Sequence, residues 1–192
     1  NAGRPGEYEA LLTAMIKDWR VKFADENLPF FIMQLPNCMQ THPQPVESGW
    51  AGMREAQRQV TLKLSNTSLV VAIDLGEWND IHPLNKKELA RRVALQVKKK
   101  VYGHKDIVHS GPLCTSVSVE GEKTILSFEE GTNDLMPVAQ LKGFALAGAD
   151  GRFKWAKAAI EGNKVVVWSE GITQPIKVRY AWDDNPQEAN LK

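Results

Sequence analysis

The chain has 192 residues, of which 43% are hydrophobic and 24% are charged, and its formal net charge is +1. This composition is typical of globular proteins with a real core and excludes a disordered, collagen-like or coiled-coil chain. The balanced charge provides no long-range field for nucleic acid or an anionic membrane. No apolar run reaches the roughly 18 residues of a transmembrane helix. We therefore expect one or two globular domains and neither a nucleic-acid nor a membrane partner.

The amino terminus and the cysteines say little about the compartment. The chain begins Asn1-Ala2-Gly3-Arg4, without an initiator Met and without the basic and apolar regions of a signal peptide. We expect either a processed chain or a part of a longer protein. Cys38 and Cys114 are too few for a disulfide framework, and they either pair or stay free.

The first half of the chain begins with a helix, a strand and a second helix. Residues 6–23 predict a helix, because apolar side chains recur there at spacings of three and four. The apolar run 29–35 predicts a strand that is buried on both faces. Residues 36–49, rich in Pro, Gln, Gly and Ser, predict a loop, and helix signals resume over 50–60.

A second strand and a third helix complete this half. The apolar run 69–73 predicts another buried strand, which ends at Asp74. Asn85 and Glu88 have the spacing of a capping box, and apolar residues carry a helix from there to about residue 103. Helices that alternate with buried strands are typical of a parallel sheet covered on both faces. Because two strands do not make a complete sheet, we expect further strands from missing sequence or another chain.

The second half has the pattern of an antiparallel β domain. Strands around residues 117–128 and 160–168 are joined by the turn signals Gly121 and Gly162-Asn163. Ile176, Val178 and Tyr180 alternate with polar residues, which predicts a strand with one wet face. We therefore divide the chain into an α/β part, 1–106, and an antiparallel β-sandwich-like part, 107–192.

The best-placed titratable cluster follows the second predicted strand. Residues 74–83 read Asp-Leu-Gly-Glu-Trp-Asn-Asp-Ile-His-Pro. In open α/β sheets, ligands and catalytic groups gather at the carboxyl ends of the strands. A carboxylate near His82 is able to orient its imidazole for acyl transfer. The alternative is a polar loop in which Asp80 caps the backbone and His82 has no role.

Other candidate residues favour structural interpretations. We interpret His42 as a surface residue of the loop 36–49, with a position over a pocket as the alternative. Three tryptophans of the second half are predicted to lie in the core, although they could stack on sugars: Trp155, Trp168 and Trp182. No His or Cys pair has the spacing of a zinc site, and no glycine-rich phosphate loop follows either strand. The chain also lacks a Gly-x-Ser-x-Gly nucleophile motif.

Several segments of the first half together resemble the sialate O-acetylesterase family of SGNH-type carbohydrate esterases. They are Asn1-Ala2-Gly3-Arg4, Asp18-Trp19-Arg20, Trp50 with Arg54-Glu55-Ala56-Gln57, Asp74-Leu75-Gly76-Glu77, and Asp80-Ile81-His82-Pro83 with Asn85-Lys86. Residues 165–168 and 178–182 are similar to the accessory β-domain of that family. The resemblance implies a partial SGNH, flavodoxin-like α/β domain over 1–106, followed by the β-sandwich accessory domain.

The resemblance also implies an activity and site residues. The expected reaction is removal of O-acetyl groups from sialic acid or other acetylated sugars by a Ser nucleophile with His82 as its base. Asn1 matches a family position that helps to form the oxyanion hole. Recurrent family segments contain Gln34, Arg54 and Glu55, which are expected to bind substrate. No metal or organic cofactor is implied, and the expected location is secreted or periplasmic.

Two departures from the family pattern limit these expectations. The Asp expected three residues before the His is Asn79, so we take Asp80 as the residue that orients His82, with Glu77 as the alternative. The nucleophile segment is absent and is expected on a missing amino-terminal segment or on a second chain of the same protein. A non-catalytic carbohydrate-binding protein and an acetylxylan-type esterase remain as alternatives.

Overall fold

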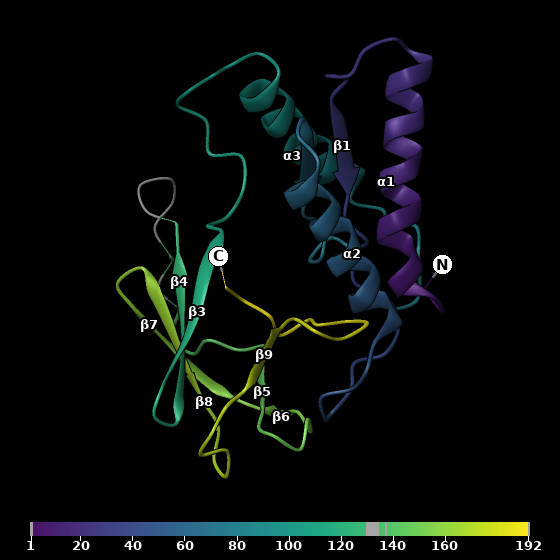
Figure 1. Cartoon of the computed structure of the whole chain (residues 1–192). Helices are drawn as coiled ribbons and strands as arrows, with labels where there is room; N and C mark the ends of the chain where they lie inside the picture. The colour runs from purple at the N-terminus through teal and green to yellow at the C-terminus, as the bar shows by residue number, and fades with distance from the viewer. Residues whose placement is uncertain (1, 130–134, 137, 192) are drawn as a thin grey trace. The chain divides into compact units, whose positions relative to one another are not determined.

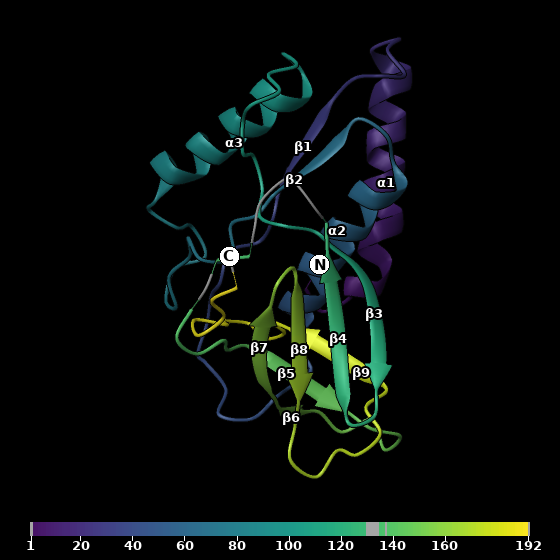
Figure 2. The ribbon, with the colours of Figure 1, turned by 90° about the vertical axis from the view of Figure 1, so that its left-hand side faces the viewer.

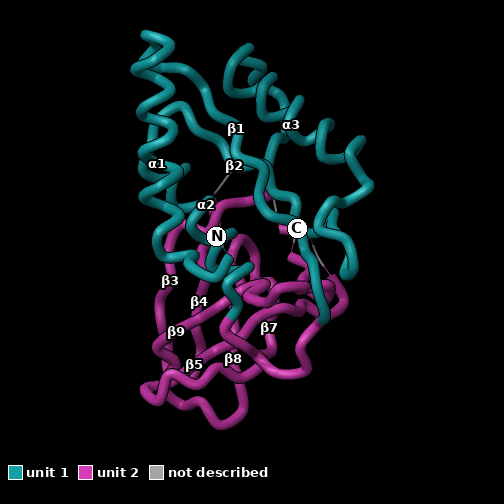
Figure 3. Tube along the Cα trace, turned by 90° about the vertical axis from the view of Figure 1, so that its right-hand side faces the viewer, with its two compact units in different colours: residues 1–40, 48–110 teal, residues 41–47, 111–192 magenta. Residues whose placement is uncertain are grey.

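The computed structural model describes residues 2–129, 135–136 and 138–191. They form two compact units (Figure 3): unit 1 contains residues 1–40 and 48–110, and unit 2 contains residues 41–47 and 111–192. Residues 41–47, which the sequence pattern places in the first half, are thus part of unit 2. None of the helices in the described part of the chain is long and apolar enough to cross a membrane.

Unit 1 is built from three helices and a parallel pair of strands (Figure 1). In chain order these are α1 (Pro5–Lys22), β1 (Phe30–Met33), α2 (Gly49–Lys63), β2 (Thr67–Val70) and α3 (Lys86–Lys100). The strands pair in parallel from Phe30 opposite Thr67 to Met33 opposite Val70. Helix α3 lies on one side of the strands, and α1 and α2 lie on the other (Figure 2). The predicted parallel α/β arrangement is therefore confirmed.

Local sequence explains where these helices begin. Pro5 opens α1, where a missing N–H costs nothing. The Ser48 hydroxyl accepts a hydrogen bond from the Ala51 N–H (2.8 Å), and the Asn85 side chain accepts one from the Glu88 N–H (3.2 Å). These bonds satisfy backbone donors that the first helical turn leaves unpaired. The predicted cap at Asn85 is confirmed, although the Glu88 carboxylate pairs with arginines of its own helix.

The core of unit 1 lies between α1, α2 and the strands. Leu12, Ile16, Ile32 and Val60 form a buried cluster. Beside it, the guanidinium of Arg20 donates to the carbonyls of Leu28 (3.1 Å) and Ser65 (2.8 Å), where the chain enters the two strands. These bonds allow a buried arginine to sit beside an apolar core.

Two strand predictions are wrong in detail. The second strand spans 67–70 instead of 69–73, because its hydrogen-bonded partner ends at Met33 and pairing stops at Val70. The first strand is not buried on both faces, since Met33 is 48% exposed. Among the described residues this sheet has two strands, β1 and β2.

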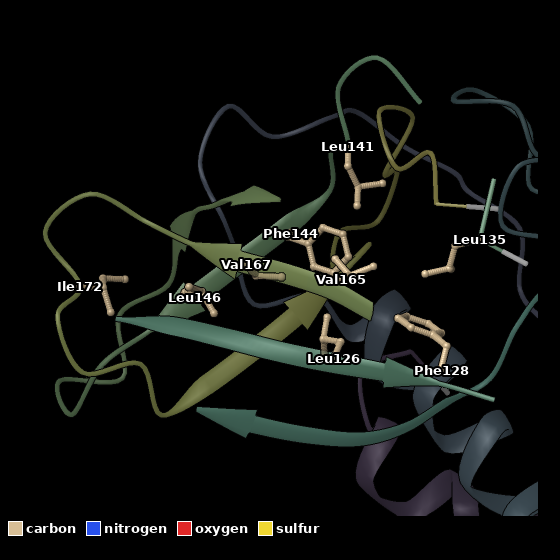
Figure 4. Close-up of a cluster of buried hydrophobic side chains, with 9 residues drawn as sticks. All are labelled: Leu126, Phe128, Leu135, Leu141, Phe144, Leu146, Val165, Val167 and Ile172. Atoms are coloured by element: carbon tan, nitrogen blue, oxygen red, sulfur yellow. The ribbon is translucent and has the colours of Figure 1, made fainter. Parts of the chain in front are cut away.

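Unit 2 is antiparallel throughout the part that the structure describes. Its strands are β3 (Cys114–Glu120), β4 (Lys123–Phe128), β5 (Phe144–Ala147), β6 (Lys154–Trp155), β7 (Lys157–Glu161), β8 (Lys164–Trp168) and β9 (Lys177–Tyr180). One sheet has the order β3-β4-β8-β7 and the other β6-β5-β9. Both sheets contribute to one cluster of apolar side chains (Figure 4), which includes Leu126, Val165 and Val167 from the first and Phe144 and Leu146 from the second.

The two predicted hairpins are confirmed. Glu120 lies opposite Lys123, and Glu161 lies opposite Lys164, so each hairpin closes through a two-residue turn. Gly121 (φ +60°) and Gly162 (φ +63°) adopt the left-handed conformation that such turns require.

The predicted alternation along β9 is wrong. Ile176 lies outside the strand and is 62% exposed, while Arg179 is half-buried. The Arg179 guanidinium lies over the rings of Phe153 (3.9 Å) and Trp182 (4.5 Å) and pairs with Glu47 (2.7 Å). Stacking on aromatic rings gives this cation a favourable place on the face expected to be wet.

Polar contacts attach α3 to the loop that follows β2. Arg92 donates to both carboxylate oxygens of Asp74 (2.7 and 2.9 Å) and also binds Glu88 (3.1 Å). Hydrogen bonds from Arg91 and then Arg92 lower the pKa of the Glu88 carboxyl to about 2. The ionised form of Glu88 is therefore favoured in the folded state.

Because its pKa is lowered on folding, Glu88 stabilises the protein at pH values above the ordinary carboxyl value of 4.5 and loses this effect as pH falls toward about 2. We expect Glu88→Gln to lower the melting temperature at pH 7, and the gap from wild type to narrow as pH falls through that window. Thermal unfolding between pH 7 and pH 3 measures it, with the exposed Glu26→Gln as control. A gap that stays constant with pH would contradict this prediction.

Candidate functional site

The candidate site in unit 1 begins where β1 and β2 end. The segments that follow the two strands continue side by side and are joined by backbone hydrogen bonds. The N–H groups of Gln34, Asn37 and Met39 donate to the carbonyl oxygens of Val70 (2.9 Å), Ile73 (3.2 Å) and Trp78 (2.8 Å), respectively. This edge of a parallel sheet is where open α/β proteins place ligands and reacting groups. The segment that carries His82 therefore starts from a fixed position.

Asn37 and Gly76 make the closest contact between these segments. The buried side-chain oxygen of Asn37 accepts a hydrogen bond from the Gly76 N–H at 2.7 Å. A Cβ at position 76 would overlap the Asn37 carbonyl oxygen. Glycine is thus required here by close approach of two backbones.

Helix α2 holds the segment after β1 from the side. The buried Gln57 amide donates to the Met33 carbonyl (3.2 Å) and accepts from the Leu35 N–H (3.0 Å). The Trp50 indole N–H donates to the Pro36 carbonyl (2.7 Å). The sequence pattern does not predict the roles of Asn37 and Gln57. For Gln57, the position of a polar side chain on the inner face of a helix is a signal that indicates a buried hydrogen bond.

His82 is the most exposed member of the candidate site. Its side chain is 86% exposed, and its Nδ1 lies 3.7 Å from Asp80 Oδ1, which is too long for a hydrogen bond. Asp80 Oδ1 accepts instead from the His82 backbone N–H (2.7 Å). The structure thus brings Asp80 and His82 together and uses Asp80 to fold the loop as an Asx turn.

Glu77, the alternative orienting residue, also binds the backbone of this loop. Its Oε1 accepts from the Leu84 N–H (3.3 Å), and its carbonyl accepts from the Asp80 N–H (3.4 Å). Both carboxylates therefore shape the loop that presents the His82 ring.

The expected substrate-binding residues differ in their surroundings. Gln34 Oε1 is buried and has no hydrogen-bond partner among the described residues. Arg54 is buried in α2. Glu55 binds Arg58 (2.8 Å) and Gln59 (2.7 Å) of its own helix. Burial raises the pKa of its carboxyl, but these hydrogen bonds outweigh burial, so the pKa lies below its usual value. Asn1 lies outside the described residues.

A second cluster of titratable groups lies in unit 2. His42 Nδ1 lies 2.6 Å from Asp183 Oδ1, and the His42 N–H donates to Asp183 Oδ2 (3.3 Å). Asp183 is buried, and His42 lines a cavity, so the interpretation of His42 as a plain surface residue is wrong. Trp155, expected in the core, is 41% exposed and lines the same cavity.

Residues of this second cluster also have the donor types of a metal site. One ligand atom each from His42, Asp183 and Asp184 lie within 4.8 Å of one another. The Asp183 carboxylate, however, already accepts from His42 and from the Asp184 N–H (2.7 Å). We interpret the cluster as a hydrogen-bonded turn and assign no metal to it. Neither Cys38 nor Cys114 forms a disulfide bond.

The chain is similar to known carbohydrate esterases over almost its whole length. It is 24% identical to sialate O-acetylesterase of Mus musculus and 25% identical to that of Homo sapiens, and both alignments cover 94% of the chain. It superposes on a crystal structure of a carbohydrate acetylesterase from Xanthomonas citri with a TM-score of 0.89 and 38% identity over 96% of the chain. No protein-family model matches.

The chain is shorter than these relatives. It spans 37% of the mouse protein, 38% of the human protein and 42% of the Xanthomonas citri chain. The resemblance stated from the sequence motifs is confirmed by these matches.

The contact between Asn37 and Gly76 predicts a site at which one methyl group is not tolerated. We expect Gly76→Ala to lower the free energy of unfolding by about 1–3 kcal/mol, since a methyl group there forces two backbones apart. Urea unfolding measures the change. Gly6→Ala is the matched control, because a Cβ at Gly6 meets nothing within 4 Å. Equal stability of Gly76→Ala and wild type would contradict the required close approach.

Proposed function

We propose that this chain, which belongs to the sialate O-acetylesterase-like family, is the C-terminal part of a carbohydrate esterase that removes O-acetyl groups from sialic acid or related sugars. The observation that carries the proposal is the exposed His82 on a loop that the parallel strand ends and α3 hold in place. A general base for acyl transfer requires this combination of a fixed backbone and an accessible ring.

The proposed reaction proceeds through an acyl-enzyme. His82 accepts the proton of a Ser hydroxyl as its oxygen attacks the acetyl carbonyl, and a tetrahedral intermediate forms. His82 then returns the proton to the sugar oxygen, which leaves as an alcohol. Water, activated by the same imidazole, attacks the acetyl-Ser ester and releases acetate. The Ser is proposed to come from sequence outside this chain, in keeping with the greater length of its relatives.

Asn1 is proposed to stabilise the oxyanion of both tetrahedral intermediates. A side-chain amide N–H placed at the developing negative charge contributes roughly 10²–10³ in rate in comparable sites. The family resemblance of the segment Asn1-Ala2-Gly3-Arg4 supports this role.

Gln34 and Arg54 are proposed to contribute to the substrate pocket. A buried acceptor without a partner is costly, and Gln34 Oε1 is such an atom among the described residues at the carboxyl end of β1. A sugar hydroxyl or an N–H of the nucleophile segment would satisfy it. Arg54 and Glu55 share α2, where the ion pair from Arg58 keeps Glu55 ionised.

The remaining parts of the proposal concern architecture and location. We assign unit 1 to a partial SGNH domain and unit 2 to a β-sandwich-like accessory domain, which the shared apolar core of its two antiparallel sheets supports. The secreted or periplasmic location and the cofactor-free reaction follow from the family resemblance.

In the complete esterase, we expect His82→Ala to lower kcat for 4-nitrophenyl acetate by at least about 10³-fold, because no other group removes the Ser proton. Initial rates of 4-nitrophenol release measure the loss. His104→Ala, which changes an exposed histidine of the same unit, should keep wild-type rates. Near-normal activity of the His82 variant would overturn the assignment of the base.

The role of Asp80 is separable from that of Glu77. Asp80→Asn keeps an oxygen for the His82 N–H but removes the charge that stabilises an imidazolium, so we expect kcat to fall by about 10²–10⁴-fold with little change in KM. Glu77→Gln should change kcat only a few-fold. The reverse result would make Glu77 the orienting residue, and normal kcat in both variants would exclude both carboxylates. The pH profile of kcat for each variant completes the test.

A further inference from the structure

A cavity of about 730 Å³ opens in unit 2 and is formed by residues of that unit alone. Its wall includes the segment 41–43, residues 140–144 before and at the start of β5, and residues 181–183 and 185–189 after β9. The volume lies in the range of small-molecule sites in proteins. Nothing in the proposed esterase mechanism uses this cavity.

Aromatic rings form part of the cavity wall. Trp155, Trp168 and Trp182 all line it. The Trp155 indole is partly exposed, and its N–H donates to the Pro43 carbonyl at 2.9 Å. That bond holds the ring in one orientation before any ligand arrives, so stacking on it costs little side-chain entropy.

Polar groups line the same cavity, and one of them, His42, has a fixed orientation. The carboxylate of Asp183 holds His42 Nδ1 at 2.6 Å, which favours a proton on Nδ1 and leaves Nε2 as an acceptor in the neutral ring. Asn185 and Gln187 also line the cavity and carry amide groups. Hydroxyl groups of a ligand would find both donors and acceptors there.

The charges of the cavity do not favour an anionic ligand. Its two lysines are paired with carboxylates, Lys142 with Glu188 (3.1 Å) and Lys157 with Glu170 (2.7 Å). A purely apolar ligand would offer no hydrogen bond to Nε2 of His42. A polyhydroxylated ring, with apolar faces and hydroxyl edges, matches both sets of groups.

We propose that this cavity is a second carbohydrate-binding site. In this site Trp155 stacks against a pyranose ring, and Nε2 of His42, whose ring is held by Asp183, accepts a hydrogen bond from a sugar hydroxyl. The choice of ligand class rests on the proposed function, since a carbohydrate esterase meets sugars as substrates. The binding itself requires none of the residues in the esterase mechanism. The accessory unit would thereby hold a glycan through rings that carry no acetyl group.

The test is isothermal titration of the 192-residue chain with xylohexaose and with cellohexaose, which are uncharged and contain no ester bond. We expect saturable binding of at least one probe, and we expect Trp155→Ala to weaken it by about tenfold or more. Trp155→Phe keeps an aromatic ring but loses the hydrogen bond to Pro43, so its affinity should lie between those of wild type and Trp155→Ala. Trp19→Phe, on α1 of unit 1, is the matched control and should bind like wild type; thermal unfolding verifies that every variant is folded.

Two results would overturn the inference: no saturable binding of either probe at millimolar concentration, or wild-type affinity in Trp155→Ala. These failures differ from failure of the proposed function. A complete esterase that hydrolyses acetyl esters while the chain binds neither probe refutes only the second site. Sugar binding by the chain, with no hydrolysis by the complete protein, refutes only the esterase assignment.

Discussion

The candidate active site depends on the hydrogen bond that the Asn37 side chain accepts from the Gly76 N–H. Strand pairing ends at Val70, and beyond it the two segments lie too irregularly for a continuous ladder. A backbone N–H that is partly shielded from water needs a partner, and the side-chain oxygen of Asn37 supplies one to Gly76 where the ladder no longer does. Position 76 must be glycine for the backbones to come this close. The position at which the His82 loop starts is therefore set by the Asn37 side chain and by the absence of a side chain at Gly76.

In unit 2, a side-chain oxygen also accepts hydrogen bonds from backbone N–H groups and so fixes a loop. The buried Asp183 carboxylate accepts hydrogen bonds from the ring and backbone of His42 and from the Asp184 N–H. Residues 41–47, which follow a unit 1 strand in the chain, are further held by the Glu47 ion pair with Arg179. That contact lowers the pKa of the Glu47 carboxyl, chiefly through the hydrogen bond from Arg179. In both units, polar side chains rather than strands fix the loops that carry the candidate site residues, as in many proteins whose sites lie on loops over a rigid scaffold.

The sequence predicts the elements whose signals are local. Helix periodicity, the cap at Asn85 and the glycine turns of the two hairpins each depend on a few neighbouring residues, and the structure has them. The end of β2 cannot be predicted from the apolar run, which continues to Ile73, because it is set by where β1 ends. The environment of His42 cannot be predicted from local sequence either, because its partner Asp183 lies 141 residues away along the chain. The exposed position of Trp155 likewise depends on a distant contact, because its indole N–H donates to the carbonyl of Pro43, which no local pattern connects to it.

The geometry of the His82 loop also bears on how the proposed esterase becomes competent. Asp80 and Glu77 both hold backbone N–H groups of the loop, so the loop is folded before any substrate or nucleophile arrives. The imidazole itself is left exposed and donates no hydrogen bond to Asp80. A general base that is misplaced by about 1 Å loses about 10²-fold in rate, so the ring must be oriented when the nucleophile segment docks. We infer that this chain fixes the backbone position of His82, and that contacts with the rest of the proposed enzyme select the His82 rotamer that reaches the Ser hydroxyl. Under the proposed mechanism, activity depends on assembly of this chain with the segment that carries the Ser, even though the loop that carries His82 is already folded.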